Sequence, residues 1–510
     1  TREYESGRVA HFEIAAPSRP GQIRVGIVSE HESNSSPGIC LDNLLILMSK
    51  MGHKTEMGEE EADFEFVFFA RENTRTTFSA HMREISTVTR ILVNNAYEME
   101  YNRDLIAAER LDILLYIALP TEKLSLYLSY ARLAPIQVGF GVGHPLTSGS
   151  MAVDYSIVSS SMYLNWDTLL RTPPDINMCL EQALVCEKEV STAATGGEEP
   201  HPSCDAMRAN GCATSVGRND TIVTTNSEQL VVFDSLGYYL EDLLFLHDEY
   251  VDALSTAYFT PCMEMDELIK KVGLSRKLKA RHVGCLDDVE AHLHGKHIRI
   301  GKSVNIYTAI QIPKKMHPSF DIVIAGIIRK DPFARIILDR RYQSFIPRLI
   351  ERQQISKELV DKHVILVPRL PHYDYQQLMS LTSVFLNTFP FGAGITSSEA
   401  IALCIPLVIH SNMSSVMNLA LAQTRALGEE FVEEWVVDSF EDYIDTAVRI
   451  ANMDRVPAPT HVRLNPQDEE KQGRMFAYRK AICEARHKLF GDEVLHEVTH
   501  EWASFFKAII

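Results

Sequence analysis

Short apolar runs alternate with amphipathic stretches in the first third of the chain. Each run is continuous and bounded by polar or turn residues, a pattern typical of buried parallel strands. The runs lie at residues 22–29, 64–70, 89–94, 111–118, 136–141 and 154–159. Helical stretches lie between several of them, for example at 38–51 and 122–132. This alternation favours a doubly wound α/β sheet.

The same alternation starts again after an irregular middle region, which begins near residue 172. Predicted strands lie at 303–307, 334–339, 363–368, 383–389 and 406–410. Predicted helices lie at about 320–328, 343–354, 373–381, 396–404 and 415–427, and a helical tail runs from about 467 to 510. We therefore expect two similar α/β halves facing a cleft, with ligands outside the carboxyl ends of the strands.

These patterns divide the chain into domains and connections. The predicted parts are an N-terminal Rossmann-like domain (1–174), an insertion (175–227), a mostly helical connection (228–300), a second Rossmann-like domain (301–460) and a helical tail (461–510). The insertion lacks periodicity. It is therefore expected to be irregular and peripheral to both sheets, as a surface loop or a docking element.

Composition narrows the class of protein and its partners. The chain has 510 residues, of which 45% are hydrophobic and 23% charged, as in soluble globular proteins. Its formal net charge of −18 disfavours duplex nucleic acid and anionic membranes as partners. No stretch approaches the roughly 20 apolar residues of a membrane span. We expect a cytoplasmic protein, with an organellar or secretory compartment as the alternatives.

The nine cysteines do not form the pattern of a disulfide scaffold. Five are scattered and are expected to be buried thiols: Cys40, Cys262, Cys285, Cys404 and Cys483. Four others lie in one polar segment: Cys179, Cys186, Cys204 and Cys212. Their spacing is too loose for a zinc site, whereas two disulfides there are conceivable.

A turn with two glycines opens the predicted helix at 396–404. Gly392 and Gly394 let the backbone turn tightly and approach a ligand closely. Three hydroxyl residues can cap the helix and leave N–H groups at its positive end: Thr396, Ser397 and Ser398. Such a turn fits phosphate or pyrophosphate, although a plain capped helix explains it about equally well.

Glu399 is expected in the first turn of this helix, where its carboxylate could accept hydrogen bonds from a ribose diol. Two well-known phosphate-binding patterns are missing from the chain. Neither the Walker sequence Gly-x4-Gly-Lys-[Ser/Thr] nor a full Gly-x-Gly-x-x-Gly after the first strand is present. Their absence disfavours kinase-like and dehydrogenase functions.

Motifs in both halves occur in an order that resembles a known family. They are RLAPIQVGFGVGHPLTSGSMAVDYSIV (132–158), LNTFPFGAGITSSEA (386–400) and WVVDSFEDYIDTAVRIAN (435–452). They resemble the protein glycosyltransferase family of O-GlcNAc transferase and the cytosolic bacterial N-glucosyltransferases, most of all the adhesin-glycosylating branch. The resemblance covers about residues 22–160 and 300–510. It implies a GT-B fold, a nucleotide-sugar held mainly by the second half, and a C-terminal tail that crosses back to the first.

The resemblance also assigns candidate residues to the donor side. The segment IPKKMHPSF (312–320) is similar to the one whose lysine contacts the donor diphosphate, which favours Lys315 over its neighbour Lys314. The segment VPRLPHYDYQQL (367–378) occupies the base-binding turn, so His372 and Tyr375 are candidates to face uracil. A solvated lysine and an ordinary surface turn are the simpler alternatives.

The acceptor side departs from the family pattern. His144 is retained in GHPLTSG and could be catalytic or could only shape its loop, whereas Ser35 and Gly149 stand where relatives have histidines. The resemblance implies an inverting, metal-independent transferase that moves a sugar from UDP-sugar to Ser/Thr or Asn of a protein, without another cofactor. The altered positions motivate an alternative, a weak or inactive domain that serves as a structural or docking subunit of a larger assembly.

Overall fold

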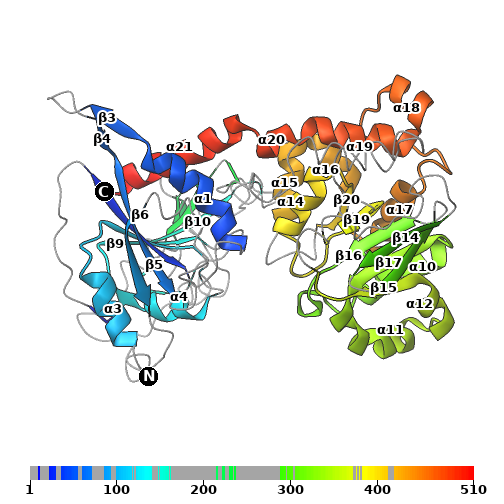
Figure 1. Cartoon of the computed structure of the whole chain (residues 1–510), viewed down its shortest axis with the longest axis horizontal. Coiled ribbons are helices and arrows are strands. Elements are labelled where there is room, and N and C mark those ends of the chain that lie inside the picture. Colours follow the sequence, from blue (N-terminus) through cyan, green and yellow to red (C-terminus); the bar gives the residue numbers. More distant parts are fainter. Residues whose placement is uncertain are drawn as a thin grey trace, which may run out of the picture. The chain divides into compact units, whose positions relative to one another are not determined.

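The computed structural model divides the chain into two compact units (Figure 1). Unit 1 contains residues 1–239 and 495–510, and unit 2 contains residues 240–494. The structure describes residues 10–11, 22–29, 36–54, 60–71, 86–92, 99–117, 119, 122–140, 148, 150–159, 161, 214–215, 221–223, 229–233, 235–236, 288–293, 296–301, 305–370, 375, 378–379, 382–411 and 419–510.

Unit 1 is built on a nine-stranded sheet with the strand order β11-β12-β13-β10-β9-β7-β2-β5-β6. Its parallel strands are β2 (Ile23–Ser29), β5 (Phe64–Arg71), β6 (Ser86–Leu92), β7 (Ile113–Tyr116), β9 (Ile136–Phe140), β10 (Tyr155–Ser159) and β13 (Gln229–Phe233). The chain proceeds outward from β2 on one side and from β7 on the other, which is the doubly wound arrangement. The strands predicted in the first third of the chain are all present.

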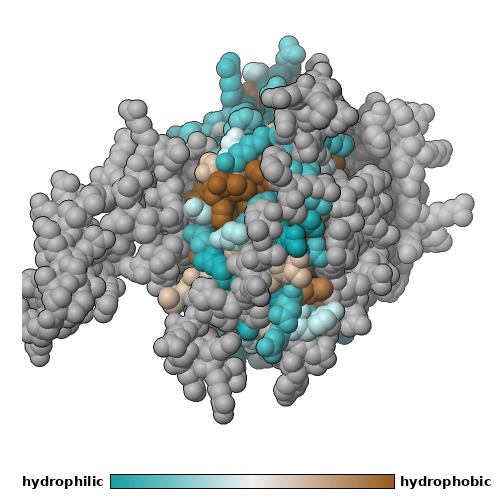
Figure 2. Space-filling model, turned by 90° about the vertical axis from the view of Figure 1, so that its left-hand side faces the viewer, coloured by the Kyte–Doolittle hydropathy of each residue, from teal (hydrophilic) through white to brown (hydrophobic). Residues whose placement is uncertain are grey.

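Helices and short strand pairs complete unit 1. They are α1 (Ser36–Ser49), α3 (Met99–Ala107), α4 (Lys123–Leu128), β1 (Ala10–His11) beside β8 (Ala131–Arg132), and β3 (Gly52–Lys54) beside β4 (Glu60–Ala62). Apolar side chains of β7 and α4 meet in one buried cluster, and this burial explains the continuous apolar runs. Figure 2 shows one face of the molecule, where a compact apolar area is bordered by hydrophilic residues.

Part of the insertion extends the edge of this sheet. The strands β11 (Thr214–Ser215) and β12 (Thr221–Val223) lie antiparallel to each other, and β12 pairs with β13. The prediction of an irregular segment is wrong for these residues, because the β-branched run of β12 pairs readily at an edge. No described residue of the insertion lies in the centre of a sheet. The four cysteines of the insertion lie outside the described residues.

The connection at 228–300 contains strands that the prediction missed. Besides β13, β14 (Asp288–Leu293) and β15 (Lys296–Gly301) form an antiparallel pair with Leu293 opposite Lys296. Apolar residues alternate in both segments, and only two residues connect them, which favours a β-hairpin. The prediction of a mostly helical connection is therefore wrong for these strands. Most other residues of the connection lie outside the described ones.

Unit 2 contains a separate six-stranded parallel sheet with the order β18-β17-β16-β19-β20-β21. Its strands are β16 (Asn305–Ala309), β17 (Ala334–Asp339), β18 (Val364–Val367), β19 (Val384–Leu386), β20 (Leu407–His410) and β21 (Val436–Val437). The predicted strands of this half are present. From β16 the chain adds strands toward β18 on one side, and from β19 it adds strands toward β21 on the other side. The carboxyl ends of the neighbours β16 and β19 are therefore the topological switch point.

Helices lie between and after these strands. They are η6 (Pro313–Lys315), α10 (Phe320–Lys330), η7 (Arg340–Phe345), α11 (Ile346–Gln353), α12 (Lys357–His363), α14 (Ile395–Ala402), α15 (Leu419–Leu427), α16 (Glu429–Trp435) and α17 (Phe440–Ala451). Gly326 lets α10 approach α17 closely, because a Cβ atom there would overlap the side chain of Ile444.

A buried carboxylate ties the amino end of this sheet together. Asp331 is 1% exposed and accepts hydrogen bonds from Asn305 Nδ2 and the Tyr307 hydroxyl, each at 2.7 Å. The Asp331→Ala variant leaves both donors without that acceptor. We expect a loss of about 1–3 kcal/mol in the free energy of unfolding, measured by urea denaturation. Asp331→Asn, which keeps an acceptor oxygen, should lose less; an equal loss would contradict this role.

The helical tail contains α18 (Pro466–Gln472), α19 (Arg474–Ala485), α20 (His487–Phe490) and α21 (Asp492–Ile509). Residues 495–510 belong to unit 1, so the tail crosses back as the resemblance implies (Figure 1). Trp502 packs edge-on against Phe140 and Phe233, with ring centroids 5.3 and 5.5 Å away. None of the described helices is long and apolar enough to cross a membrane.

Candidate functional site

The candidate site lies where two loops leave the switch point of the unit 2 sheet. One loop follows β16 and the other follows β19, and these strands are neighbours. Backbone hydrogen bonds join the loops: His317 N donates to Phe389 O at 2.6 Å, and Phe391 N donates to Lys315 O at 3.4 Å. Ligands of doubly wound sheets bind at such points. The fold thus brings together two segments that are far apart in the sequence.

Lys315 lies between these loops. Its Nζ atom is 4.7 Å from the centroid of the Phe391 ring and 3.4 Å from Gln311 Oε1. Its side chain is half-buried, whereas Lys314 is exposed. Burial lowers the pKa of Lys315, and the charge of Lys314 lowers it further. An anionic group beside Lys315 would stabilise its charged form.

Gln311 is a site residue that the sequence analysis missed. It is 5% exposed, and its Nε2 atom donates to Thr396 Oγ1 at 2.5 Å. Its side-chain oxygen, Oε1, accepts a hydrogen bond from Lys315 Nζ. Gln311 therefore connects the lysine to the first turn of α14. The one signal in the sequence is its position just beyond the carboxyl end of a predicted strand, where ligand-binding side chains gather.

The start of α14 differs from the prediction. Gly394 is the N-cap, with φ −105° and ψ −88°, and no side chain caps the helix. The prediction that Thr396, Ser397 or Ser398 caps it is wrong, because all three lie inside the helix. With no capping side chain, the first N–H groups of the helix have no side-chain or intrahelical acceptor at this positive end.

Ser397 has a structural role in this turn. Its hydroxyl is buried and lies 2.6 Å from Gly394 O and 2.7 Å from Gln423 Oε1. Gln423, which belongs to α15, also donates to Gly394 O at 3.1 Å. Serine in a helix commonly bonds back to a preceding carbonyl in this way. The hydroxyl of Ser397 is thus engaged within the protein, and its main-chain amide is the group that could bind a ligand.

The glycine loop before α14 is shaped by the polar residues that follow β19. Ala393 N donates to Asn387 Oδ1 at 2.7 Å, and the Thr388 hydroxyl donates to Phe391 O at 3.0 Å. Gly392 is buried within this loop, and Gly394 is half-buried at its end. These hydrogen bonds hold the loop beside Lys315.

Glu399 lies in the second turn of α14 and is 3% exposed. The prediction of a first-turn position is wrong because the helix begins at Ile395. Burial raises the pKa of Tyr375 well above its ordinary value, and the charge of Glu399 raises it further. His372 lies outside the described residues.

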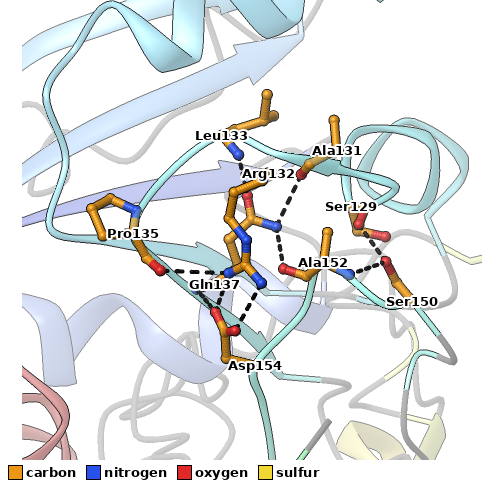
Figure 3. A network of polar contacts seen from close by, with 9 residues as sticks. All are labelled: Ser129, Ala131, Arg132, Leu133, Pro135, Gln137, Ser150, Ala152 and Asp154. Carbon is orange, nitrogen blue, oxygen red and sulfur yellow. Dashed lines mark hydrogen bonds and ion pairs between the residues drawn. The ribbon is translucent and has the colours of Figure 1, made fainter. Parts of the chain in front are cut away.

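Motif residues of the first half form a structural network (Figure 3). Asp154 accepts hydrogen bonds from Arg132 Nη2 at 2.9 Å and from Gln137 N at 2.7 Å. Gln137 Nε2 donates to the carbonyls of Ala131 and Ala152 at 3.1 and 2.7 Å. These contacts hold the starts of β9 and β10 together. Residues 134–137 (APIQ) and 154–155 (DY) of the first family motif therefore stabilise the fold here.

The candidate acceptor-side positions are not described by the structure. His144, Ser35 and Gly149 all lie outside the described residues. The candidate residues that the structure describes therefore belong to the donor side.

Comparisons with known proteins address the fold. No family model matches the chain. A solved structure of an O-GlcNAc transferase mutant from Thermobaculum terrenum superposes with a TM-score of 0.58 at 15% identity, covering 98% of this chain and 72% of that one. The chain has the GT-B fold. The two Rossmann-like units predicted from the sequence are confirmed.

A curated relative supports the resemblance noted in the sequence. Over 145 residues the chain is 24% identical to the probable UDP-N-acetylglucosamine--peptide N-acetylglucosaminyltransferase SPINDLY of Solanum lycopersicum. The match covers 27% of this chain and 15% of that protein. The similarity to O-GlcNAc transferases is thus found both in sequence and in this GT-B structure.

Proposed function

We propose that this GT-B chain is a glycosyltransferase that uses a UDP-sugar as donor. The observation that carries the proposal is the placement of Lys315 beside the start of α14, bridged by Gln311, at the switch point of the unit 2 sheet. An ammonium and an uncapped helix start together provide positive charge and amide donors for a diphosphate.

The reaction proposed is an inverting transfer. An acceptor atom forms a bond to the anomeric carbon of the sugar while the bond from that carbon to the UDP oxygen breaks, and the acceptor loses a proton. Negative charge develops on the departing diphosphate. Lys315 and the amides at the start of α14 would stabilise that charge, which is how a transferase can proceed without a metal ion. UDP-sugar is then the only co-substrate.

The nucleoside is proposed to lie beside Tyr375 and Glu399. A uracil ring would stack on the ring of Tyr375, and the carboxylate of Glu399 would accept hydrogen bonds from the ribose diol. The charge of Glu399 acts on the hydroxyl of Tyr375, which supports a base and a ribose bound side by side. His372 is proposed to face the uracil as well. The acceptor is proposed to be Ser, Thr or Asn of a protein, with His144 on the acceptor side, and the protein to be cytoplasmic.

Ligand binding tests this proposal. A thermal-shift screen of the full chain should include UDP, UDP-N-acetylglucosamine, UDP-glucose and GDP; the second is the donor in the name of the curated relative. A nucleotide at 100 times its dissociation constant stabilises the protein by about 2.7 kcal/mol. For a unit of this size that corresponds to a rise of about 5–10 °C in Tm. GDP should have a smaller effect.

Absence of any shift would favour a different function. A chain that binds none of these nucleotides would be a structural or docking subunit whose glycine turn is a relic of the fold. Binding of UDP without transfer to any protein would instead indicate a weak or inactive enzyme.

A further inference from the structure

A disulfide links the candidate donor site to the helical tail. Cys404, which follows α14, is bonded to Cys483 in α19, with Cα atoms 5.0 Å apart. The prediction that both are buried thiols is wrong, because the fold joins residues that are 79 positions apart. Nothing in their sequence spacing indicates this pair.

Two arginines hold the same end of α14. Arg479 is 2% exposed and donates through Nε to Cys404 O at 3.1 Å and through Nη2 to Leu403 O at 2.8 Å. Arg486 Nη1 donates to Ala402 O at 2.8 Å. The carboxyl end of the helix is therefore fixed by a covalent bond and by two guanidinium groups from the tail. Positive groups suit this end of a helix.

We propose that the Cys404–Cys483 disulfide is a thiol-exchange site that controls the affinity of the donor site. This inference rests on the proposed function. The helix between the two sites has eight residues and is about 12 Å long. Because Ser397 to Ala402 are all buried, the helix moves as one body. Loosening its carboxyl end therefore displaces the amides at its amino end.

The surroundings of the two sulfur atoms set the direction of exchange. Cys404 is fully buried, whereas Cys483 is half-buried, so Cys483 Sγ is the sulfur that we assign to attack by an external thiolate. Attack there forms a mixed disulfide with Cys483 and releases Cys404 as a thiolate. Arg486 Nη1 lies 3.8 Å from Cys404 Sγ and stabilises that leaving group. The second thiol of the same dithiol reductant then attacks the mixed disulfide and releases Cys483. The reductant ends as a cyclic disulfide, and its two protons convert the released thiolates to two protein thiols.

Calorimetric titration of the full chain with UDP, before and after reduction by dithiothreitol, tests the coupling. Peptide mapping by mass spectrometry should first show the Cys404–Cys483 link in the oxidised protein. We expect reduction to weaken UDP binding about fivefold, the lower end of typical coupling between sites. By linkage, saturating UDP should make reduction of this bond less favourable by the same factor. Cys483→Ser should bind UDP as the reduced protein does.

A matched pair of variants tests the exchange chemistry. Arg486→Met should slow reduction by roughly threefold, because the leaving thiolate loses its positive neighbour, whereas Arg486→Lys should remain close to the wild-type rate. Equal UDP affinity in both redox states, or no linked peptide in the oxidised protein, would overturn this inference and leave the proposed function intact. If neither state binds UDP, the proposed function fails and the inference falls with it.

Discussion

Replacing Trp502 by alanine is expected to destabilise unit 1 by about 3–5 kcal/mol. The indole is completely buried between the rings of Phe140 and Phe233, which belong to β9 and β13. Removing it leaves a cavity between α21 and the sheet, and such cavities cost more than the lost transfer free energy. Urea denaturation followed by circular dichroism should show an earlier transition for unit 1, with unit 2 unchanged.

Polar contacts also attach α21 to the rest of unit 1. Glu501 accepts hydrogen bonds from Ser235, and Lys507 Nζ lies 2.7 Å from Asp63 Oδ2. The control variant is His496→Ala, an exposed position of the same helix, which should change stability by no more than about 0.5 kcal/mol. Equal stability of Trp502→Ala and the control would mean that the tail is not part of the unit 1 core.

The Lys315→Ala variant is expected to reduce UDP affinity on the order of tenfold to a hundredfold. A charge-assisted hydrogen bond is usually worth about 1.5–3 kcal/mol, and each 1.4 kcal/mol corresponds to roughly a factor of ten in affinity. Lys315 is half-buried against Phe391 and Gln311, so little water screens its charge from a diphosphate. Calorimetry with UDP measures the loss directly.

Lys314→Ala is the matched control for this experiment. Lys314 is adjacent in sequence and carries the same charge, but it is exposed and should contribute far less to binding. A larger loss for Lys314→Ala than for Lys315→Ala would move the diphosphate contact to that residue. Unchanged affinity in both variants would remove η6 from the donor site.

The pattern of apolar residues along the chain was sufficient to predict the α/β architecture of both units. The continuous apolar runs predicted β2, β5 and β7 in one unit and β16, β17 and β20 in the other, because a strand buried on both faces has no polar side to interrupt the run. The GT-B fold was implied by the resemblance of the motifs to a known family. Where the pattern was short and alternating, as in β14 and β15, a helical connection was predicted wrongly.

The details of the candidate site depended on the tertiary structure. The sequence by itself predicted the glycine turn, Lys315 and Tyr375 as candidates, since these follow predicted strands or match motifs. It did not identify Gln311 as the bridge, nor Gln423 as the partner that draws Ser397 inward. Capping was predicted from residue type alone, whereas the helix begins at Ile395, so all three hydroxyl residues lie inside it and none stands at the N-cap.

The sequence thus determined the order and type of most elements, and the tertiary structure decided which distant residues meet. Periodicity is a local property, because each side chain's face is set by its own backbone. The link from Cys404 to Cys483 and the packing of Trp502 on Phe140 join positions separated by long stretches of chain. Such contacts depend on how whole sheets and helices pack, and no spacing rule along the chain encodes that packing.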